Sequence, residues 1–220
     1  MGSSKNLSGK KLVEYKNLLA LAKDQQDVLI GTILGDGNIR ILKKEAFLTV
    51  SHGEKQKDYV FWKYNVFQNW VLTKPRKEIR QYYKNRERSL VSWRFSTISH
   101  PEITRYYKLF YPKGKKAIPS LINSILISPL TLAVWYMDDG SRKPYGKGAF
   151  LHTQSFSVSD QKRLIESLWK NFAIEAKLSS AGLSKGNRKY RLYIRAKSFL
   201  HFRNLILPYI PPSFLYKISL

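Results

Sequence analysis

The sequence repeats a short pattern at a distance of about half its length, and this constrains the fold more than any other feature. Leu34-Gly35-Asp36-Gly37 recurs 103 residues later as Met137-Asp138-Asp139-Gly140. Ala46-Phe47-Leu48 recurs as Ala149-Phe150-Leu151 at the same offset, so no gap separates the two matches. One match could arise by chance, but an ordered series indicates two copies of one structural unit.

The similarity continues towards the end of each copy. Trp93-Arg94-Phe95 aligns with Leu192-Tyr193-Ile194 at an offset of 99 residues. Two copies of this size fit two small fused domains, each with its own core. We therefore expect one domain over residues 1–117, which includes an N-terminal extension, and a second over residues 118–220.

Each half predicts the same order of elements: an apolar helix that ends at Asp-Gly, two strands, a longer helix, two strands and a closing helix. Asp27 suits the N-cap of the first helix and Pro129 the first turn of its counterpart, and Gly37 and Gly140 end both helices. The fold class is α+β, with two pseudo-symmetric αββαββα half-folds that each carry a curved antiparallel sheet. The expected ranges are 27–36, 38–42, 46–52, 57–72, 78–83, 90–97 and 101–110, then 129–139, 141–143, 148–156, 159–172, 176–180, 190–196 and 198–207.

The charge of the chain predicts a polyanionic partner. Its 39 Lys and Arg residues outweigh 15 Asp and Glu residues, which gives a formal net charge of +24. A compact protein with this charge repels itself unless a polyanion neutralises it, so nucleic acid or an anionic membrane surface is the expected partner. Charge alone is equally compatible with a basic protein of the ribosomal kind.

Several other classes of site are disfavoured. The chain has no cysteine, and its four histidines are far apart, which argues against disulfides and against a zinc site. No apolar run approaches the length that spans a bilayer, and the first residues contain no hydrophobic signal core, so we expect no membrane association.

Strand alternation gives each predicted sheet an apolar face and a basic face. From Val91 to Ser96 the odd positions are apolar and the even ones polar, and in 190–196 the apolar positions are the even ones. A solvated face is the usual interpretation of such a pattern, but it normally mixes both charge signs, and acids are nearly absent from these stripes. A curved basic sheet can enter the major groove and read base edges. The residues that we expect to contact DNA are Arg40, Lys43, Lys44, Arg80, Tyr82, Lys84, Ser92, Arg94, Arg142, Lys143, His152, Gln154, Lys189, Arg191, Tyr193 and Arg195.

Asp36 and Asp139 each end an apolar helix in a chain that has few acids. The C-terminal end of a helix is already negative, which makes it an unfavourable place for an anion. A single Asp-Gly pair is best interpreted as a turn, but two at equivalent positions of a repeat favour a shared role. If the two helices pack side by side, both carboxylates meet with the carbonyls of Gly35 and Asp138, a set of hard oxygen ligands suited to Mg²⁺. Metal-assisted hydrolysis of a phosphodiester would follow.

The two segments Leu29 to Gly37 and Leu132 to Gly140 resemble the LAGLIDADG motif of homing endonucleases. The resemblance covers nearly the whole chain and is strongest to the monomeric, two-motif subgroup encoded by introns of organelles, in which Trp-Tyr-Met-Asp-Asp-Gly and Thr-Gln-Ser-Phe also recur. It implies a site-specific endonuclease that makes a double-strand break in a long asymmetric DNA target and leaves short 3′ overhangs. It also implies an intracellular location in a mitochondrion or another organelle.

The resemblance also assigns roles within the site. It implies that Asp36 and Asp139 are the catalytic acids and metal ligands, with the carbonyls of Gly35 and Asp138 completing the shell around roughly two or three Mg²⁺ ions. Mn²⁺ or Ca²⁺ would replace Mg²⁺ for binding. A basic residue near each scissile phosphate matches Lys116 and Lys217, which lie 80 and 78 residues after the two acids.

The second motif departs from the small-residue pattern of the family. Gly31 and Gly35 of the first copy are replaced by Val134 and Asp138 in the second. We therefore expect an asymmetric interface, in which bulk from one helix fills the space beside the glycines of the other. Such asymmetry would make the two strand cleavages unequal.

Two alternative functions stay open. Some relatives of this family are maturases that bind their own intron RNA, and a basic surface serves either role, although the presence of both acids favours cleavage. A non-catalytic DNA-binding protein is the second alternative, but it gives no reason for two acids at equivalent helix ends.

Overall fold

The computed structural model describes residues 7–82, 85–144 and 146–219, and for residues 82 and 85–88 it describes the backbone alone. Its contacts group the chain into two compact units. The first unit comprises Met1–Val28 and Asp36–Tyr107, and the second comprises Leu29–Gly35 and Lys108–Leu220. These units group residues by contact rather than by sequence repeat, so the domain boundary expected between residues 117 and 118 stays a prediction.

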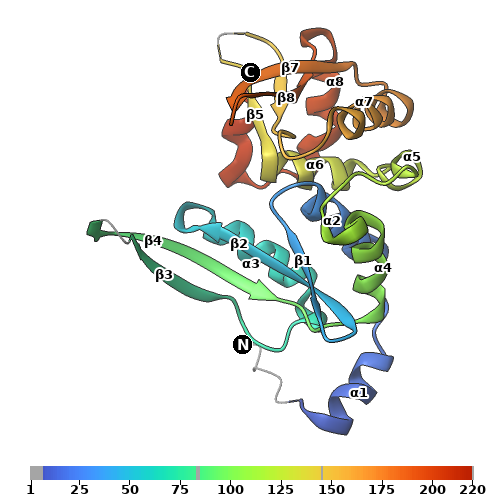
Figure 1. Ribbon diagram of the computed structural model, residues 1–220, viewed down its shortest axis with the longest axis vertical. Helices are drawn as coiled ribbons and strands as arrows, with labels where there is room; N and C mark the ends of the chain where they lie inside the picture. The colour runs from blue at the N-terminus through green and yellow to red at the C-terminus, as the bar shows by residue number, and fades with distance from the viewer. Residues whose placement is uncertain (1–6, 83–84, 145, 220) are drawn as a thin grey trace. The chain divides into compact units, whose positions relative to one another are not determined.

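The order of elements confirms two αββαββα repeats in an α+β fold (Figure 1). Two further helices, α1 and α5, precede the repeats. The first repeat consists of α2 (Lys23–Leu34), β1 (Asn38–Leu42), β2 (Glu45–Gly53), α3 (Lys57–Val66), β3 (Arg76–Tyr82), β4 (Asn85–Ser96) and α4 (Pro101–Phe110), after α1 (Gly9–Asn17). The second consists of α6 (Pro129–Asp139), β5 (Gly140–Arg142), β6 (Ala149–Leu151), α7 (Val158–Phe172), β7 (Ala176–Ser184), β8 (Asn187–Ile194) and α8 (Ala196–Ile206), after α5 (Ile122–Ile125).

Each repeat builds one four-stranded antiparallel sheet with the same order of strands. The orders are β1-β2-β4-β3 and β5-β6-β8-β7, so the second and fourth strands of each repeat lie side by side at the centre of the sheet. In the first sheet Val50 pairs with Phe95, and in the second Leu151 pairs with Leu192. The two sheets therefore arise from the same pattern of alternation.

The apolar face of each sheet is covered by the helix that lies between the two strand pairs of its repeat. In the first unit α3 packs on β2 and β4, and in the second α7 packs on β7 and β8. Leu48, Val50 and Phe95 line the first core and are at most 3% exposed. Leu164 and Leu192 are fully buried in the second. Burial of this apolar surface is the main driving force for each half-fold.

The apolar helix of the second copy forms over the predicted range. Ser128 caps its start by accepting a hydrogen bond from the Leu130 amide at 3.2 Å, and Pro129 occupies the first turn. Its residues from Thr131 to Asp138 are all buried. An apolar helix this completely covered belongs to the core of its unit.

Several element bounds differ from the sequence prediction, and the contacts at three of them show why. Helix α2 begins at Lys23, so Asp27 lies inside it and pairs with Lys23 one turn earlier, which makes the N-cap prediction wrong. The helix predicted over 57–72 ends at Val66, where Gln25 donates to the Val66 carbonyl at 2.8 Å. The strand predicted over 148–156 is shortened to Ala149–Leu151, because the Thr153 amide turns back to the Leu151 carbonyl.

Among the residues that the structure describes, no helix combines the length and the apolar character needed to cross a membrane.

Candidate functional site

The second unit contains a close contact between the two motif segments. A Cβ atom built on Gly31 would lie 2.6 Å from the Thr131 carbonyl oxygen and 2.7 Å from Val134 Cβ. A Cβ atom on Gly35 would lie 2.8 Å from Asp138 Oδ2. Real side chains do not tolerate such distances, so glycine is required at both positions. The expected asymmetry is confirmed, because the larger residues of the second motif fill the space beside the glycines of the first.

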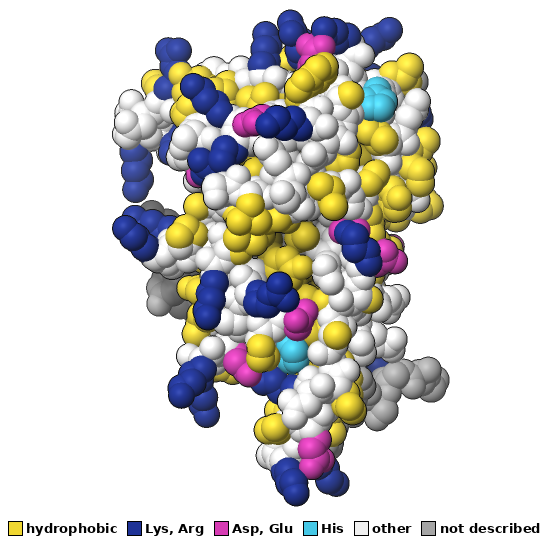
Figure 2. Space-filling model, turned by 90° about the vertical axis from the view of Figure 1, so that its right-hand side faces the viewer, with side chains coloured by type: hydrophobic (Ala, Val, Ile, Leu, Met, Phe, Trp, Pro, Cys, Tyr) yellow, Lys and Arg dark blue, Asp and Glu magenta, His cyan; other side chains and the backbone are white. Residues whose placement is uncertain are grey.

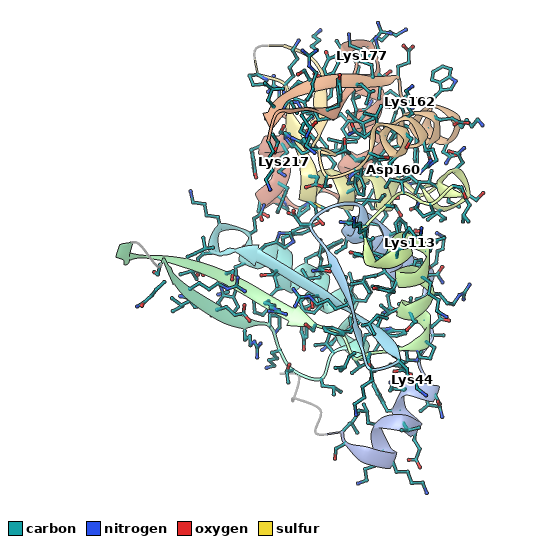
Figure 3. The ribbon with its side chains drawn as sticks, viewed as in Figure 1. Lys44, Lys113, Asp160, Lys162, Lys177 and Lys217 are labelled. Atoms are coloured by element: carbon teal, nitrogen blue, oxygen red, sulfur yellow. The ribbon has the colours of Figure 1, made fainter. Side chains whose placement is uncertain are left out.

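Two lysines donate hydrogen bonds to carbonyls near the ends of the motif segments. Lys116 Nζ donates to the Gly35 carbonyl at 2.7 Å, and Lys217 Nζ donates to the Met137 carbonyl at 2.7 Å (Figure 3 labels Lys217). The two lysines thus hold comparable positions, but Lys116 binds the residue directly before its aspartate, and Lys217 binds the residue two before. Sequence spacing alone predicted that they would be equivalent, and their contacts differ by one residue.

Tyr136 fixes the backbone that carries Lys217. Its hydroxyl donates to the Lys217 carbonyl at 2.7 Å, and its ring meets that of Phe202 edge-on with centroids 5.0 Å apart. Burial raises the pKa of Tyr136, and Arg142 lowers it by a smaller amount. The hydroxyl therefore stays protonated and keeps donating over the whole physiological pH range.

The donor atoms at this end of the second unit fit a divalent cation. The Gly35 carbonyl already accepts a hydrogen bond from a cationic ammonium group, Asp139 is half-buried and Asp138 is 9% exposed. Oxygen atoms of carboxylates and carbonyls are the ligands that Mg²⁺ prefers, and Mg²⁺ usually keeps several waters beside one or two carboxylates. Over the described ranges no group of three or more His, Asp or Glu side chains is placed to hold a metal ion. The expected metal ligands include only two such side chains, Asp36 and Asp139, and the other two ligands are backbone carbonyls.

Asp36 begins the second segment of the first unit and is open to solvent. Its side chain is 52% exposed, and its Oδ2 lies 3.8 Å from Nδ1 of His52. The His52 side chain is only 3% exposed. A solvent-accessible carboxylate beside a buried imidazole was not predicted from the sequence. His52 fits the regular pattern of its strand, so nothing in the sequence indicated that its ring lies beside Asp36.

The polar face of the first sheet contains the predicted basic residues and one acid that the sequence analysis missed. Arg94 and Ser92 lie on β4, and the register places Arg76 opposite Arg94 and Glu78 opposite Ser92. Glu78 lies within 3.8 Å of Arg76, Arg80 and Arg94. The predicted stripe therefore has an acid at its centre, which lowers its net charge. Extending the Arg80 stripe back by two and then four residues would have found Glu78 and Arg76.

The remaining predicted residues of this unit lie on β1 and the turn that follows it. Arg40 is exposed on β1, and Lys43 and Lys44 form the turn, where Lys43 adopts a left-handed backbone with φ 57°. The side chain of Tyr82 and the whole of Lys84 lie outside the described residues, so their expected contacts stay predictions.

The polar face of the second sheet is a layer of basic and aromatic side chains. The guanidinium carbon of Arg191 lies 3.6 Å from the centroid of the Phe150 ring, and Lys143 Nζ lies 5.4 Å from that of Tyr193. Stacking on a ring holds a guanidinium group in a fixed orientation. Lys177 on β7 pairs with Tyr193 on β8, and its side chain is exposed on the same face (Figure 3). It is not among the residues that the sequence predicts to contact DNA.

His152 joins this face to the end of α6. Its amide donates to the Asp139 carbonyl at 2.8 Å, and its Nε2 lies 2.8 Å from the Ser141 hydroxyl. Gln154 lies 3.4 Å from the other ring nitrogen. Burial lowers the pKa of His152, and the charges of Arg191 and Lys217 lower it further. The ring is therefore neutral near pH 7 and acts as a hydrogen-bonding group rather than a cation.

The other predicted residues of the second sheet differ in how available their charge is. Arg142 is exposed at the end of β5, and Lys189 is half-buried on β8. Arg195 pairs with Glu175 at 3.2 Å, and Lys197 pairs with the same carboxylate. The charge of Arg195 is thus partly compensated within the protein.

Figure 2 shows that Lys and Arg side chains are spread widely over the face that it draws, with fewer acidic side chains among them. This distribution agrees with the net charge of +24. The excess charge is therefore not confined to the polar faces of the sheets.

Comparisons with known proteins agree with this architecture. The model of the LAGLIDADG DNA endonuclease family matches residues 26–202. A probable intron-encoded endonuclease 1 of Wickerhamomyces canadensis is 30% identical over 218 residues, which cover 96% of this chain and 91% of the relative. The DNA endonuclease I-ChuI of Chlamydomonas applanata is 27% identical and aligns over 91% of this chain and 97% of its own. The cytochrome b mRNA maturase bI2 of Debaryomyces hansenii is 28% identical over 90% of this chain and 75% of its own.

A solved structure shows the same fold over almost the full length. The homing endonuclease I-WcaI, bound to its DNA recognition sequence, superposes with a TM-score of 0.87 at 30% identity and covers 97% of this chain and 95% of its own. With a family model that matches well over half of its residues, this chain belongs to the LAGLIDADG DNA endonuclease family.

Proposed function

We propose that the protein is a site-specific DNA endonuclease that makes a double-strand break in a long asymmetric target by metal-dependent hydrolysis. The single observation that carries this proposal is the pair of lysines on the motif carbonyls, Lys116 on Gly35 and Lys217 on Met137, each near a motif aspartate. Membership of the family supports it, as does the I-WcaI structure, which is a complex with DNA. We further propose that the products carry short 3′ overhangs.

We propose that Asp36 and Asp139 hold divalent ions, with the carbonyls of Gly35 and Asp138 as further ligands. Bound Mg²⁺ would lower the pKa of a water and neutralise charge on the scissile phosphate. Roughly two or three ions would bind, and Mn²⁺ or Ca²⁺ would take their place for binding. A structure of an I-DmoI variant with its nicked target DNA and Mn is similar in fold alone, with a TM-score of 0.51 at 14% identity.

Lys116 and Lys217 supply positive charge at the carbonyls of Gly35 and Met137 in the two motif segments. Each ammonium group is oriented by a backbone carbonyl at 2.7 Å. A preoriented donor of this kind stabilises the extra negative charge that develops on a phosphate during hydrolysis. We therefore assign both lysines to the catalytic site.

The polar faces of the two sheets would bind the DNA. Residues such as Arg191, held over Phe150, and Arg94, held by Glu78, are preoriented, and this lowers the entropy lost when they contact base edges. The exposed lysines would contact phosphates and carry no sequence information. Because the two sheets carry different side chains, the target is expected to be asymmetric.

Double-stranded DNA is thus the proposed partner, and the protein would act as a monomer because one chain contains both motifs. The names of the relatives, which include an intron-encoded endonuclease and a cytochrome b mRNA maturase, support an origin in an organelle intron. We propose a mitochondrion or another organelle as the site of action.

The test begins with selection of cleaved sites from a randomised DNA library by the full chain in Mg²⁺. We expect one long asymmetric target, cut in both strands. Asp36→Asn and Asp139→Asn should each abolish double-strand cutting of that target and leave DNA affinity within about threefold of wild type. Double-strand breaks at the wild-type rate in either variant would refute the assignment.

A second candidate function is supported by the maturase relative, which is 28% identical over 90% of this chain. A maturase would bind its own intron RNA and accelerate splicing with or without DNA cleavage. Splicing assays with the intron RNA, in the presence and absence of the chain, separate the two roles. If Asp36→Asn abolished cutting and retained splicing, the chain would have both activities.

A further inference from the structure

A buried chain of side chains lies directly behind Asp36 in the first unit. His52 is on β2, next to the end of the strand, and its ring centroid lies 5.2 Å from that of Tyr59 on α3. Lys63 Nζ lies 4.4 Å from the centroid of the same Tyr59 ring. Tyr59 is 1% exposed and Lys63 is 0% exposed. The three side chains therefore connect the core of the unit to the solvent-exposed carboxylate.

This arrangement holds the imidazole ring in place. Helix α3 packs on β2 (Figure 1), and Tyr59 also stacks on Trp62 with centroids 5.7 Å apart. The His52 ring packs against the buried Tyr59 ring, so it cannot change rotamer without opening the core, where packing is as dense as in a crystal. His52 thus presents Nδ1 at a fixed point, 3.8 Å from Asp36 Oδ2.

Asp36 itself lacks comparable support from burial, because its side chain is 52% exposed. Burial alone therefore does not fix the rotamer of the carboxylate, and a metal ligand must adopt one orientation. A distance of 3.8 Å exceeds a direct hydrogen bond but suits a polar contact or a bridging water. An imidazole nitrogen held at this distance favours the orientations of the Asp36 carboxylate in which an oxygen atom points towards it.

The second repeat carries Thr153 at the position that is equivalent to His52 by strand register. Asn38 pairs with Thr49 in the first sheet, so Asp36 aligns with Ser51, and His52 is one residue further along. Gly140 pairs with Leu151 in the second sheet, so Asp139 aligns with His152, and Thr153 is one residue further along. Thr153 is fully buried and its hydroxyl donates to Gln161 at 3.1 Å.

We propose that His52 is a positioning residue for the Asp36 carboxylate and that it makes the two halves chemically unequal. The proposal rests on the proposed endonuclease function. Cleavage of the strand that depends on Asp36 needs the polar group that His52 holds beside the carboxylate, whereas cleavage of the other strand does not. Groups that orient metal ligands typically change metal affinity or activity by about 10–100-fold when they are removed.

The test uses the full chain and the selected target duplex, with a different label on each strand. The Asp36-dependent strand is defined as the one that Asp36→Asn slows more. His52→Leu fills the space without a polar edge, and we expect it to slow this strand at least about 10-fold more than the other, so that nicked duplex accumulates. His52→Asn places a polar atom where Nδ1 stood and should restore most of the rate. Thr153→Val is the matched control and should leave the ratio of the two rates unchanged.

A second measurement does not depend on cleavage. The affinity of the full chain for Mn²⁺ alone, measured by electron paramagnetic resonance, should fall about 10-fold in His52→Leu and stay unchanged in Thr153→Val. If His52→Leu fails to fold, as judged by thermal melting, His52→Ala takes its place.

Equal slowing of both strands, or an unchanged rate ratio together with unchanged Mn²⁺ affinity, would overturn the proposal. If the wild-type chain cuts no DNA, the endonuclease function fails instead. The Mn²⁺ measurement then decides on His52 alone, and equal affinities of wild type and His52→Leu would overturn its role.

Discussion

Gly35 lies directly against Asp138, with so little space between them that a Cβ atom on Gly35 would come within 2.8 Å of an Asp138 carboxylate oxygen. The same relationship holds one turn earlier between Gly31 and Val134. Small residues of the first motif segment therefore face larger residues of the second. Replacing a residue on either side should lower the free energy of unfolding.

Gly35→Ala should lower the free energy of unfolding by about 1–3 kcal/mol, because the added methyl group overpacks a close contact. Urea denaturation followed by circular dichroism measures the change. Asp138→Gly in the same chain should recover part of the loss by removing the opposing side chain. Gly53→Ala is the control, since the nearest atom to its new Cβ would be 4.0 Å away. A stable Gly35→Ala protein would show that the contact is looser than the structure indicates.

Lys116→Met should slow cleavage roughly 100-fold, because it keeps the length of the side chain and removes the charge held beside Gly35. DNA affinity should change little, and Lys217→Met should act in the same way on its own side. Single-turnover rates on the selected duplex provide the measurement. Lys113→Met, an exposed lysine three residues away (Figure 3), is the matched control and should cut at the wild-type rate.

Asp160→Asn should destabilise the second unit by about 1–3 kcal/mol. The carboxylate is 6% exposed, accepts from the Ile118 amide at 3.4 Å and the Ser157 amide at 3.3 Å, and pairs with Arg163. Exposed Lys162 on the same helix offers the control Lys162→Gln, which should leave the urea midpoint unchanged (Figure 3). Equal midpoints for both variants would contradict the assigned role.

Glu175→Gln should strengthen DNA binding, because it releases Arg195 and Lys197 from their shared carboxylate. The slope of log affinity against log salt should steepen by about one unit. Fluorescence anisotropy over a salt series gives both values. Glu166→Gln, which also removes one acid, is the control for net charge alone.

The same carboxylate gives a pH dependence with a definite sign. The hydrogen bond from Lys197 lowers the pKa of Glu175 below its ordinary value of 4.5, and the charges of Lys197 and Arg195 add to this. A lowered pKa contributes stability above that ordinary value, and the contribution is lost as pH falls through the lowered pKa. Between about pH 5 and pH 3, Glu175→Gln should therefore lose less stability than wild type in urea titrations.

The sequence predicts the order of elements because alternation and helical periodicity are local signals, and Pro129–Asp139 and Pro101–Phe110 form over the predicted ranges. It misplaces the start of α2, since Asp27 satisfies a local capping pattern while the helix gains its first turn from Lys23. Tertiary contacts such as Gln25 on Val66 decide where helices end, and no window of sequence contains both partners.

The candidate site follows the same division. The repeat identifies Asp36 and Asp139 without any structure, and the spacing from them identifies Lys116 and Lys217. The carbonyl that each lysine contacts, the acid at Glu78 and the imidazole at His52 depend on strand register and side-chain packing. These are properties of neighbours that are far apart in the chain, so sequence patterns could not locate them.

One feature of the fold limits how this enzyme can be rebuilt. Helix α2 is divided, with its first residues in the first unit and Leu29–Gly35 in the second. A protein engineer who separates the chain at the repeat boundary would leave this apolar segment attached to the wrong fragment. Chimaeras and split reporters made from this scaffold should therefore keep each Leu29–Gly35 segment together with the α6 helix against which its glycines were fitted.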